Sequence, residues 1–198
     1  MADAGTSIQS LYVAYFHRPA DVAGLQYWSG VLAADPKAYD GIAQSFALSL
    51  EYWTTYIGQD NRQVVDSVYQ NLFGRHADTA GIDYWARLLD QKALTVANVV
   101  TAVSKGAQGL DQTVIDGKVA AATAFTGRLD LKLEQLAYSG DFANKVASDY
   151  LATIVDGPTA ATALVPANID AAIAKFAFVF VTPLGESADV VGVPPAHA

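Results

Sequence analysis

The sequence predicts an all-α fold, a helical bundle built from two helix–turn–helix repeats and a C-terminal helical portion. Residues 11–33 recur as residues 68–90, at a constant offset of 57 in the numbering, and such self-similarity is typical of repeated structural units. Apolar residues follow helical spacing, whereas no convincing set of alternating strands is found. We expect residues 1–108 to form the two-repeat unit, residues 109–181 the C-terminal helical portion packed on it, and residues 182–198 a tail.

The two copies of the repeat read LYVAYFHRPADVAGLQYWSGVLA and VYQNLFGRHADTAGIDYWARLLD. They share aromatic, charged and glycine positions, and both end in a Tyr-Trp pair and an apolar stretch. This many identities in one window predict that the two copies fold alike. The matched pairs are Tyr12 and Tyr69, Phe16 and Phe73, Arg18 and Arg75, Asp21 and Asp78, Gly24 and Gly81, Tyr27 and Tyr84, and Trp28 and Trp85.

Each copy predicts two helices joined by a tight turn. Thr6 or Ser7 is the expected N-cap of the first helix, and Pro19 ends it because proline lacks the amide proton. Asp21 and Asp78 stand where the N-cap of the second helix belongs. The side chains expected in the core are Ile8, Leu11, Tyr12, Tyr15, Phe16, Leu25, Trp28, Val31 and Leu32 in the first copy, and Val65, Val68, Tyr69, Leu72, Phe73, Ile82, Trp85, Leu88 and Leu89 in the second.

A third helix is expected after each pair, over residues 39–56 and 95–103, and the rest of the chain also reads as helical. We expect Trp53 in the core and Asp60 as a cap. We expect Asp141 to begin a helix that Gly157-Pro158 ends, and Asn168 to open the last one. Residues 178–181 are β-branched or aromatic and could alternatively form a short strand. The expected core positions of these later segments are Ile42, Phe46, Val96, Val99, Val100, Val103, Ile115, Val119, Ala122, Phe125, Leu129, Val146, Tyr150, Leu151, Ile154, Val155, Ile169, Ile173, Phe176 and Phe180.

The composition excludes several classes of protein. With 52% hydrophobic and 16% charged residues, the chain buries too much apolar surface to be disordered. Its net charge of −8 argues against a nucleic-acid partner, because a phosphate backbone would be repelled. The absence of cysteine removes disulfides, thiolate metal sites and cysteine nucleophiles.

The two ends of the chain predict its cellular route. The N-terminus MADAGTSIQS has no basic leader and no apolar core, so we expect no Sec signal peptide. The longest apolar stretch, residues 171–184, is too short for a transmembrane segment. After Lys175 the chain carries only Glu186 and Asp189 as charged residues and ends in a small apolar tail. A base-poor C-terminus on an acidic, cysteine-free chain favours type I secretion, and an ordinary frayed terminus is the alternative.

The repeat motif, Tyr-x3-Phe/Leu-x-Arg-x2-Asp-x2-Gly-x2-Tyr-Trp, resembles a bacterial domain family of unknown function that occurs in secreted and surface-associated proteins and is distantly similar to phycobilisome linker domains. It is also similar to segments in the N-terminal anchoring domain of alphaproteobacterial surface-layer proteins. The resemblance covers residues 8–105 well and 112–181 more weakly. It implies an all-α fold, a non-enzymatic role and type I secretion. The calcium-binding repeats that accompany such domains are absent, and His17 and His76 are not part of the pattern.

Arg18 with Asp21, and Arg75 with Asp78, are the candidate ligand-binding residues. As two equivalent sites they could bind a carboxylate, a sugar or a cation. In the structural interpretation, which we favour, each Asp caps the second helix while each Arg bonds carbonyls exposed at the end of the first. We expect Gly24 and Gly81 to permit a close helix approach.

His17 and His76 are the candidate ligands of an alternative metal or haem site, since both are expected in turns near aromatic residues. The structural interpretation is a surface turn histidine. No EF-hand loop is found, although haem and calcium both stay open as cofactors. The three tryptophans have core spacing, and a sugar-stacking platform is the alternative interpretation of them.

We therefore expect a secreted or cell-surface interaction module that binds a glycan, a lipopolysaccharide or another protein and needs no cofactor. A small extracellular haem or metal carrier is the alternative. No serine-nucleophile, metalloprotease, Walker or dinucleotide-binding motif is present, so an enzyme is not expected. The sequence does not indicate an oligomeric state.

Overall fold

A computed structural model describes residues 3–177, which form twelve α-helices and one 3₁₀ helix without a strand. The all-α prediction is confirmed, and no helix in this range is long and apolar enough to cross a membrane. The first repeat contains α1 (Ala4–Phe16), α2 (Val22–Ala34), η1 (Pro36–Ala38), α3 (Tyr39–Ala47) and α4 (Leu50–Tyr56). The second contains α5 (Asn61–Phe73), α6 (Thr79–Asp90), α7 (Val96–Lys105) and α8 (Gly109–Arg128). The C-terminal portion contains α9 (Lys132–Ala137), α10 (Gly140–Ala152), α11 (Gly157–Ala163) and α12 (Pro166–Ala177).

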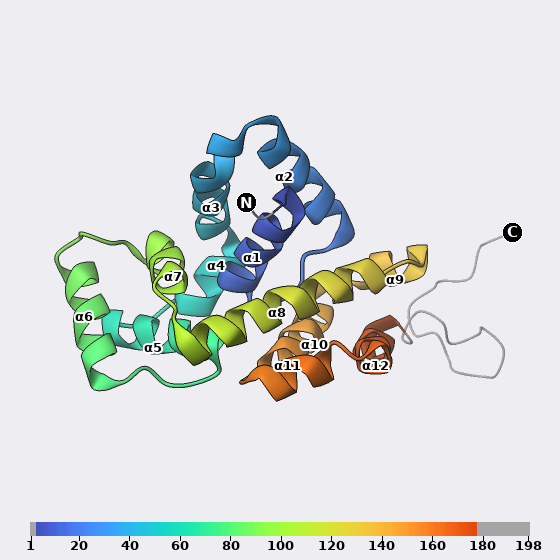
Figure 1. Cartoon of the computed structure of the whole chain (residues 1–198). Coiled ribbons are helices and arrows are strands. Elements are labelled where there is room, and N and C mark those ends of the chain that lie inside the picture. Colours follow the sequence, from blue (N-terminus) through green and yellow to red (C-terminus); the bar gives the residue numbers. More distant parts are fainter. Residues whose placement is uncertain (1–2, 178–198) are drawn as a thin grey trace, which may run out of the picture.

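The first three helices of the two repeats begin at equivalent positions, as the sequence repeat predicts. The fourth helices differ in length, because α4 has 7 residues whereas α8 has 20. Figure 1 shows α8 as a long rod that crosses below α1 and runs from the second repeat to the C-terminal helices. The long helix therefore contacts all three parts of the fold. The matched helix starts are Ala4 and Asn61, Val22 and Thr79, and Tyr39 and Val96.

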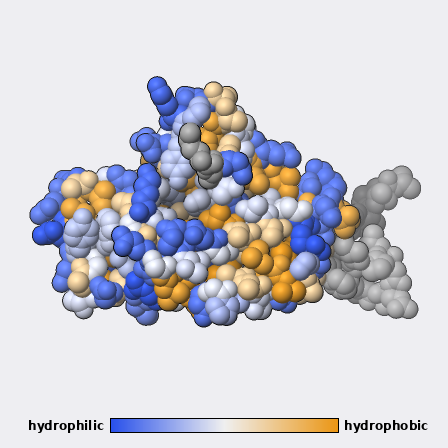
Figure 2. All heavy atoms as spheres, in the orientation of Figure 1, coloured by the Kyte–Doolittle hydropathy of each residue, from blue (hydrophilic) through white to orange (hydrophobic). Residues whose placement is uncertain are grey.

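Two clusters of buried apolar side chains hold these parts together. The first joins the two repeats and includes Tyr15, Phe46 and Val68, none more than 4% exposed. The second joins the C-terminal helices to α8 through Phe125 and Phe176, and it reaches α1 at Val13. One face of the molecule carries mixed polar and apolar residues, with apolar residues gathered around α10 to α12 (Figure 2). Because α8 supplies Ile115 to the first cluster and Phe125 to the second, the C-terminal portion packs on the repeat unit through this helix.

The prediction of a single helix over residues 39–56 is wrong, because two helices, α3 and α4, occupy this range. The chain breaks after Leu48, and Ser49 caps α4 by accepting a hydrogen bond from the Tyr52 amide while its hydroxyl donates to the Phe46 carbonyl. A serine that bonds backbone on both sides competes with helix continuation. The break turns Trp53 outward, where it is 48% exposed instead of lying in the core.

Three predictions of where a helix begins or ends are also wrong. Asp3, not Thr6 or Ser7, caps α1. Ser139, not Asp141, occupies the N-cap position of α10. Gly157-Pro158 begins α11 under an Asp156 cap instead of ending α10, since proline is well suited to the first turn of a helix.

Other local predictions have mixed outcomes. Asp60 does cap α5, with Gln63 completing a capping box. The last helix begins at Pro166, slightly before the expected Asn168. Val155 is 41% exposed and not in the core. Phe180, the alternative strand at 178–181 and the tail at 182–198 lie outside the described residues.

Candidate functional site

The turn between α1 and α2 is organised by Arg18. The Arg18 Nε and Nη2 atoms donate to the two carboxylate oxygens of Glu51 on α4, at 2.6 and 3.0 Å, and Nη1 donates to the Pro19 carbonyl at 3.1 Å. A two-pronged guanidinium–carboxylate pair fixes orientation as well as charge. The turn is thereby tied to a helix 33 residues further along the chain.

Aromatic rings surround this guanidinium group. Its central carbon lies 5.5 to 5.8 Å from the ring centres of Tyr12, Phe16 and Tyr138. Burial alone would lower the pKa of Arg18, but the hydrogen bonds to Glu51, together with the electrostatic interactions with Tyr138 and Glu51, outweigh it and raise that pKa. Arg18 is therefore a charged, buried and fully engaged side chain, 8% exposed as a residue.

The second repeat reproduces the arrangement with different exposure. Arg75 donates from Nε and Nη2 to Asp111 at 2.8 and 2.7 Å, and from Nη1 to the His76 carbonyl at 3.1 Å. The guanidinium lies 5.2 Å from the Tyr69 ring and 5.8 Å from the Phe73 ring. The Arg75 side chain is 42% exposed, against 10% for Arg18, so the same interaction faces solvent in the second copy.

The two aspartates of the motif cap helices and do not pair with the arginines. Asp21 accepts a hydrogen bond from the Gly24 amide at 2.7 Å, and Asp78 accepts one from the Gly81 amide at 2.6 Å. These are the hydrogen bonds that the capping interpretation of Asp21 and Asp78 expects. Each arginine instead finds its carboxylate on the fourth helix of its repeat.

Both repeats have a glycine at the same position because a tyrosine hydroxyl lies close to its Cα in each repeat. A Cβ at Gly24 would collide with the Tyr12 hydroxyl, and a Cβ at Gly81 would lie 3.1 Å from the Tyr69 hydroxyl. Any larger residue would force the tyrosine side chain or one of the two helices to shift, more at Gly24 than at Gly81. The expected close helix approach is confirmed at both glycines.

The two histidines occupy unlike places. His17 ends α1 in the left-handed conformation, at φ 56°, where the second repeat has Gly74 at φ 67°. Its Nε2 lies 2.9 Å from the Asn71 amide nitrogen, and its Nδ1 is buried with no partner in the described part of the chain. Burial, reinforced by the charge of Lys118, lowers the pKa of His17 to about 3. The surface interpretation is thus wrong for His17, whereas His76 is exposed and bonds Asp66 at 2.8 Å.

This arrangement does not fit a haem or metal site built from the two histidines. His17 borders a cavity of about 40 Å³, which has room for water but not for a porphyrin, while His76 borders a separate cavity of about 580 Å³. Within residues 3–177 no group of three His, Asp or Glu side chains could hold a metal ion. The Asp60 carboxylate caps α5, as expected.

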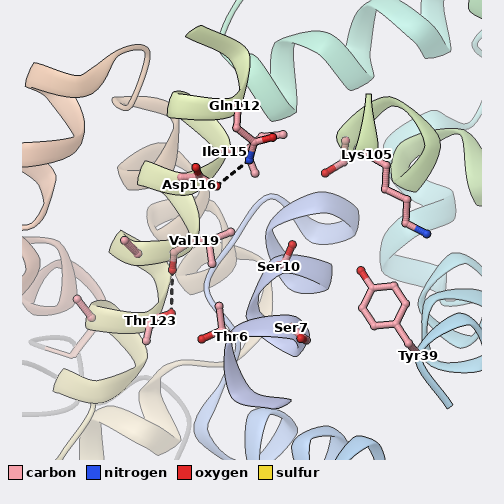
Figure 3. A pocket seen from close by; sticks show the side chains of 13 residues that line it. Thr6, Ser7, Ser10, Tyr39, Lys105, Gln112, Ile115, Asp116, Val119 and Thr123 are labelled. Atoms are coloured by element: carbon pink, nitrogen blue, oxygen red, sulfur yellow. Dashed lines mark hydrogen bonds between the residues drawn. The ribbon is translucent and has the colours of Figure 1, made fainter. Parts of the chain in front are cut away.

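Another cavity among the described residues was not anticipated from the sequence. It is a groove of about 890 Å³ between α1 and α8 that extends to α3 and α7. In Figure 3 the hydroxyl side chains of α1 lie between α8 on one side and Tyr39 and Lys105 on the other. We call it the α1–α8 groove; it is lined by Thr6, Ser7, Ser10, Tyr39, Ser104, Lys105, Gln112, Ile115, Asp116, Val119, Ala120, Thr123 and Ala124.

The α1–α8 groove combines an apolar floor with polar walls. Ile115 and Val119 contribute the floor, and Gln112 donates to Asp116 at 2.8 Å on the wall. The Lys105 ammonium lies 5.7 Å from the centre of the Tyr39 ring. A signal was present in the sequence, because Thr6, Ser7 and Ser10 place hydroxyls at helical spacing, but two of them were interpreted as caps.

The capping role makes a direct prediction. Asp21→Ala and Asp78→Ala should each lower the free energy of unfolding by about 0.5–2 kcal/mol, because an amide of the first turn loses its acceptor. Asp→Asn at either position should restore most of the loss, since the amide oxygen can accept the same bond. Urea unfolding measures the free energy of unfolding of the alanine and the asparagine variants. Stability unchanged in the alanine variants would contradict the capping role.

His17 is half-buried with a desolvated, neutral ring, and this predicts a pH dependence. Its folded-state pKa of about 3 lies below the ordinary 6.5, so the unfolded chain takes up a proton first and stability is lost as the pH falls. Between pH 7 and pH 5 this loss is about 2 kcal/mol. His17→Gly and His17→Asn, which both tolerate the left-handed conformation, should lack it. Equal pH dependence of unfolding in the wild type and both variants would contradict a buried neutral imidazole.

Comparison with known proteins adds a family match without a function. A family model described as a domain of unknown function (DUF4214) matches residues 43–109, a segment that holds the second copy of the repeat. No curated protein and no solved structure matches the chain. The match confirms similarity to a domain family of unknown function over these residues.

Proposed function

We propose that this chain is a secreted, non-enzymatic interaction module of the cell surface or extracellular matrix, and that the α1–α8 groove binds a glycan. The observation that carries the proposal is the groove itself, about 890 Å³ with hydroxyl-rich walls over an apolar floor. Ligand sites in proteins have this size and this mixture of apolar lining with a few polar groups.

The chemistry of the lining suits a saccharide. A sugar ring offers hydroxyls around its edge and aliphatic C–H groups on its faces. Ser7, Ser10 and Thr123 can exchange hydrogen bonds with such hydroxyls, and Asp116 can accept from them. The Tyr39 ring and the apolar floor supply surface for the C–H faces.

The lining favours binding over catalysis. Asp116 is held by Gln112, and neither histidine of the repeats borders the groove. A hydroxyl nucleophile needs a base within hydrogen-bond reach, and no such pair lines this groove. The proposal therefore assigns recognition to it and no reaction.

Secretion is supported by the resemblance of the repeat motif to domains of secreted and surface-layer proteins and by the base-poor C-terminus. A protein on the outside of a bacterial cell meets lipopolysaccharide and exopolysaccharide in abundance. Lipopolysaccharide is accordingly the first glycan to test.

Binding is tested by surface plasmon resonance over immobilised lipopolysaccharide and a panel of neutral polysaccharides. Saturable binding to at least one surface is expected, and Asp116→Ala and Tyr39→Ala should each weaken it about tenfold, a loss of about 1.4 kcal/mol. Tyr84→Ala removes an exposed tyrosine outside the groove and should leave binding unchanged. Groove variants that bind like the wild type would overturn the assignment.

Export is tested by deleting residues 186–198, which removes none of the described helices. The full chain should accumulate in the medium of the producing cell, while the truncated chain should stay inside. A replacement of the same residues by a Gly-Ser segment of equal length controls for chain length. Equal secretion of all three forms would show that the tail carries no export signal.

A further inference from the structure

The two repeats hold their helix junctions in the same way. The Ala20 amide donates to Gln9 at 3.1 Å, and the Ala77 amide, its counterpart in the second copy, donates to Asp66 at 3.0 Å. Gln9 and Asp66 themselves occupy equivalent positions of the two copies. The same position of the first helix therefore fixes the same turn in both copies, with an amide in one and a carboxylate in the other.

In the first repeat α8 and the C-terminal portion cover this junction. The Thr126 hydroxyl of α8 donates to the Ala20 carbonyl at 2.7 Å and lies 2.9 Å from the Gln9 amide nitrogen, from which it accepts. The Tyr138 hydroxyl donates to the Pro19 carbonyl at 2.7 Å. Both Gln9 and Ala20 are completely buried. A helix of the same chain thus docks on the first junction through one hydroxyl side chain.

In the second repeat the equivalent surface is open. A cavity of about 580 Å³ lies there, and no group within residues 3–177 donates to the Ala77 carbonyl, the counterpart of the Ala20 carbonyl. The long helix α8 contacts α5 elsewhere, through Lys118, and it contacts the turn after α5 through Asp111. We call this cavity the second-repeat junction; it is lined by Gln59, Arg62, Gln63, Asp66, Ser67, His76, Ala77 and Ile82.

The first repeat has Gln9 where the second repeat has Asp66. This difference changes which side chain can occupy the second-repeat junction. Partial burial raises the pKa of Asp66, but hydrogen bonds from His76, Ala77 and Gln70 outweigh it and hold that pKa below its ordinary value. A carboxylate only accepts, so Asp66 cannot donate to a threonine as Gln9 does. One oxygen of Asp66 already accepts from Gln70 and lies 2.8 Å from His76, and the other accepts from the Ala77 amide. An atom at the place of the Thr126 hydroxyl therefore meets only acceptors, the remaining lone pair of Asp66 and the Ala77 carbonyl, and must donate to them. A lysine ammonium carries three donors and a compensating charge, whereas a hydroxyl carries one donor.

We propose that the second-repeat junction is the docking site for an α-helix of a partner protein, and that a lysine of that helix takes the place that Thr126 of α8 has in the first repeat. The site lies apart from the α1–α8 groove and does not depend on glycan binding.

The test uses two fluorescein-labelled peptides of residues 114–130, each held helical by a lactam bridge between Asp116 and a lysine at position 120. One keeps Thr126, and the other carries Thr126→Lys. In anisotropy titrations against the full chain, the lysine peptide should bind at least tenfold tighter than the threonine peptide. Asp66→Gln, which installs the side chain of the first repeat, should weaken the lysine peptide about tenfold and tighten binding of the threonine peptide, so that the preference is reversed.

Asp149→Asn is the matched control, because this exposed aspartate of α10 does not line the cavity, and it should change neither affinity. Ser67→Arg on the cavity wall should block both peptides while thermal melts show a folded chain. The proposal is overturned if neither peptide binds saturably, or if Asp66→Gln leaves the preference intact. It is likewise overturned if the wild type self-associates in an Asp66-dependent manner, which would make the occupant a second copy of the chain.

Discussion

The buried ion pair between Arg18 and Glu51 is the interaction on which the rest of the structure depends. It fastens the turn between α1 and α2 to α4, and the Tyr138 ring from the C-terminal portion packs on the same guanidinium group. A buried guanidinium without a counter-charge is strongly unfavourable, so loss of the Glu51 charge should destabilise the first repeat. The pair thereby links the first repeat internally and gives the C-terminal helices a fixed surface.

The second repeat uses the same chemistry at the surface. Arg75, Asp111, Tyr69 and Phe73 stand in the same relation, but no helix of the described chain covers the junction. The two repeats thus contain one helix junction that is buried in the core, in the first repeat, and one that is exposed, in the second. The two candidate binding surfaces follow from this asymmetry, since α8 both covers the first junction and forms a wall of the α1–α8 groove.

Local features were predictable from the sequence, because they depend on residues close in the chain. The helix class, the internal repeat and the capping roles of Asp21 and Asp78 all follow from spacing and side-chain chemistry. The break at Ser49 was missed because a hydroxyl that bonds backbone on both sides leaves no apolar signature. Trp53 has core spacing only if that helix continues.

The partners of the arginines could not be predicted in the same way. Glu51 and Asp111 lie 33 and 36 residues from their arginines, so they do not occupy equivalent positions of the two copies and the repeat alignment does not connect them. The α1–α8 groove likewise depends on helices that are distant in sequence. Which junction is buried depends on where the C-terminal portion packs, and this is a property of the whole fold.

The most direct test of this account compares two carboxylates that perform the same task in different surroundings. Glu51→Gln and Asp111→Asn each remove the charge opposite an arginine while keeping the shape of the side chain. Urea unfolding should show a loss of about 2–3 kcal/mol for Glu51→Gln, because Arg18 is only 10% exposed and loses its counter-charge. The loss for Asp111→Asn should be about 0–1 kcal/mol, because Arg75 is 42% exposed and solvent screens its charge, although the Asp111 side chain, at 20%, is less exposed than Glu51, at 37%. Equal losses, or a loss below about 1 kcal/mol for Glu51→Gln, would contradict the claim that the fold depends on the buried pair.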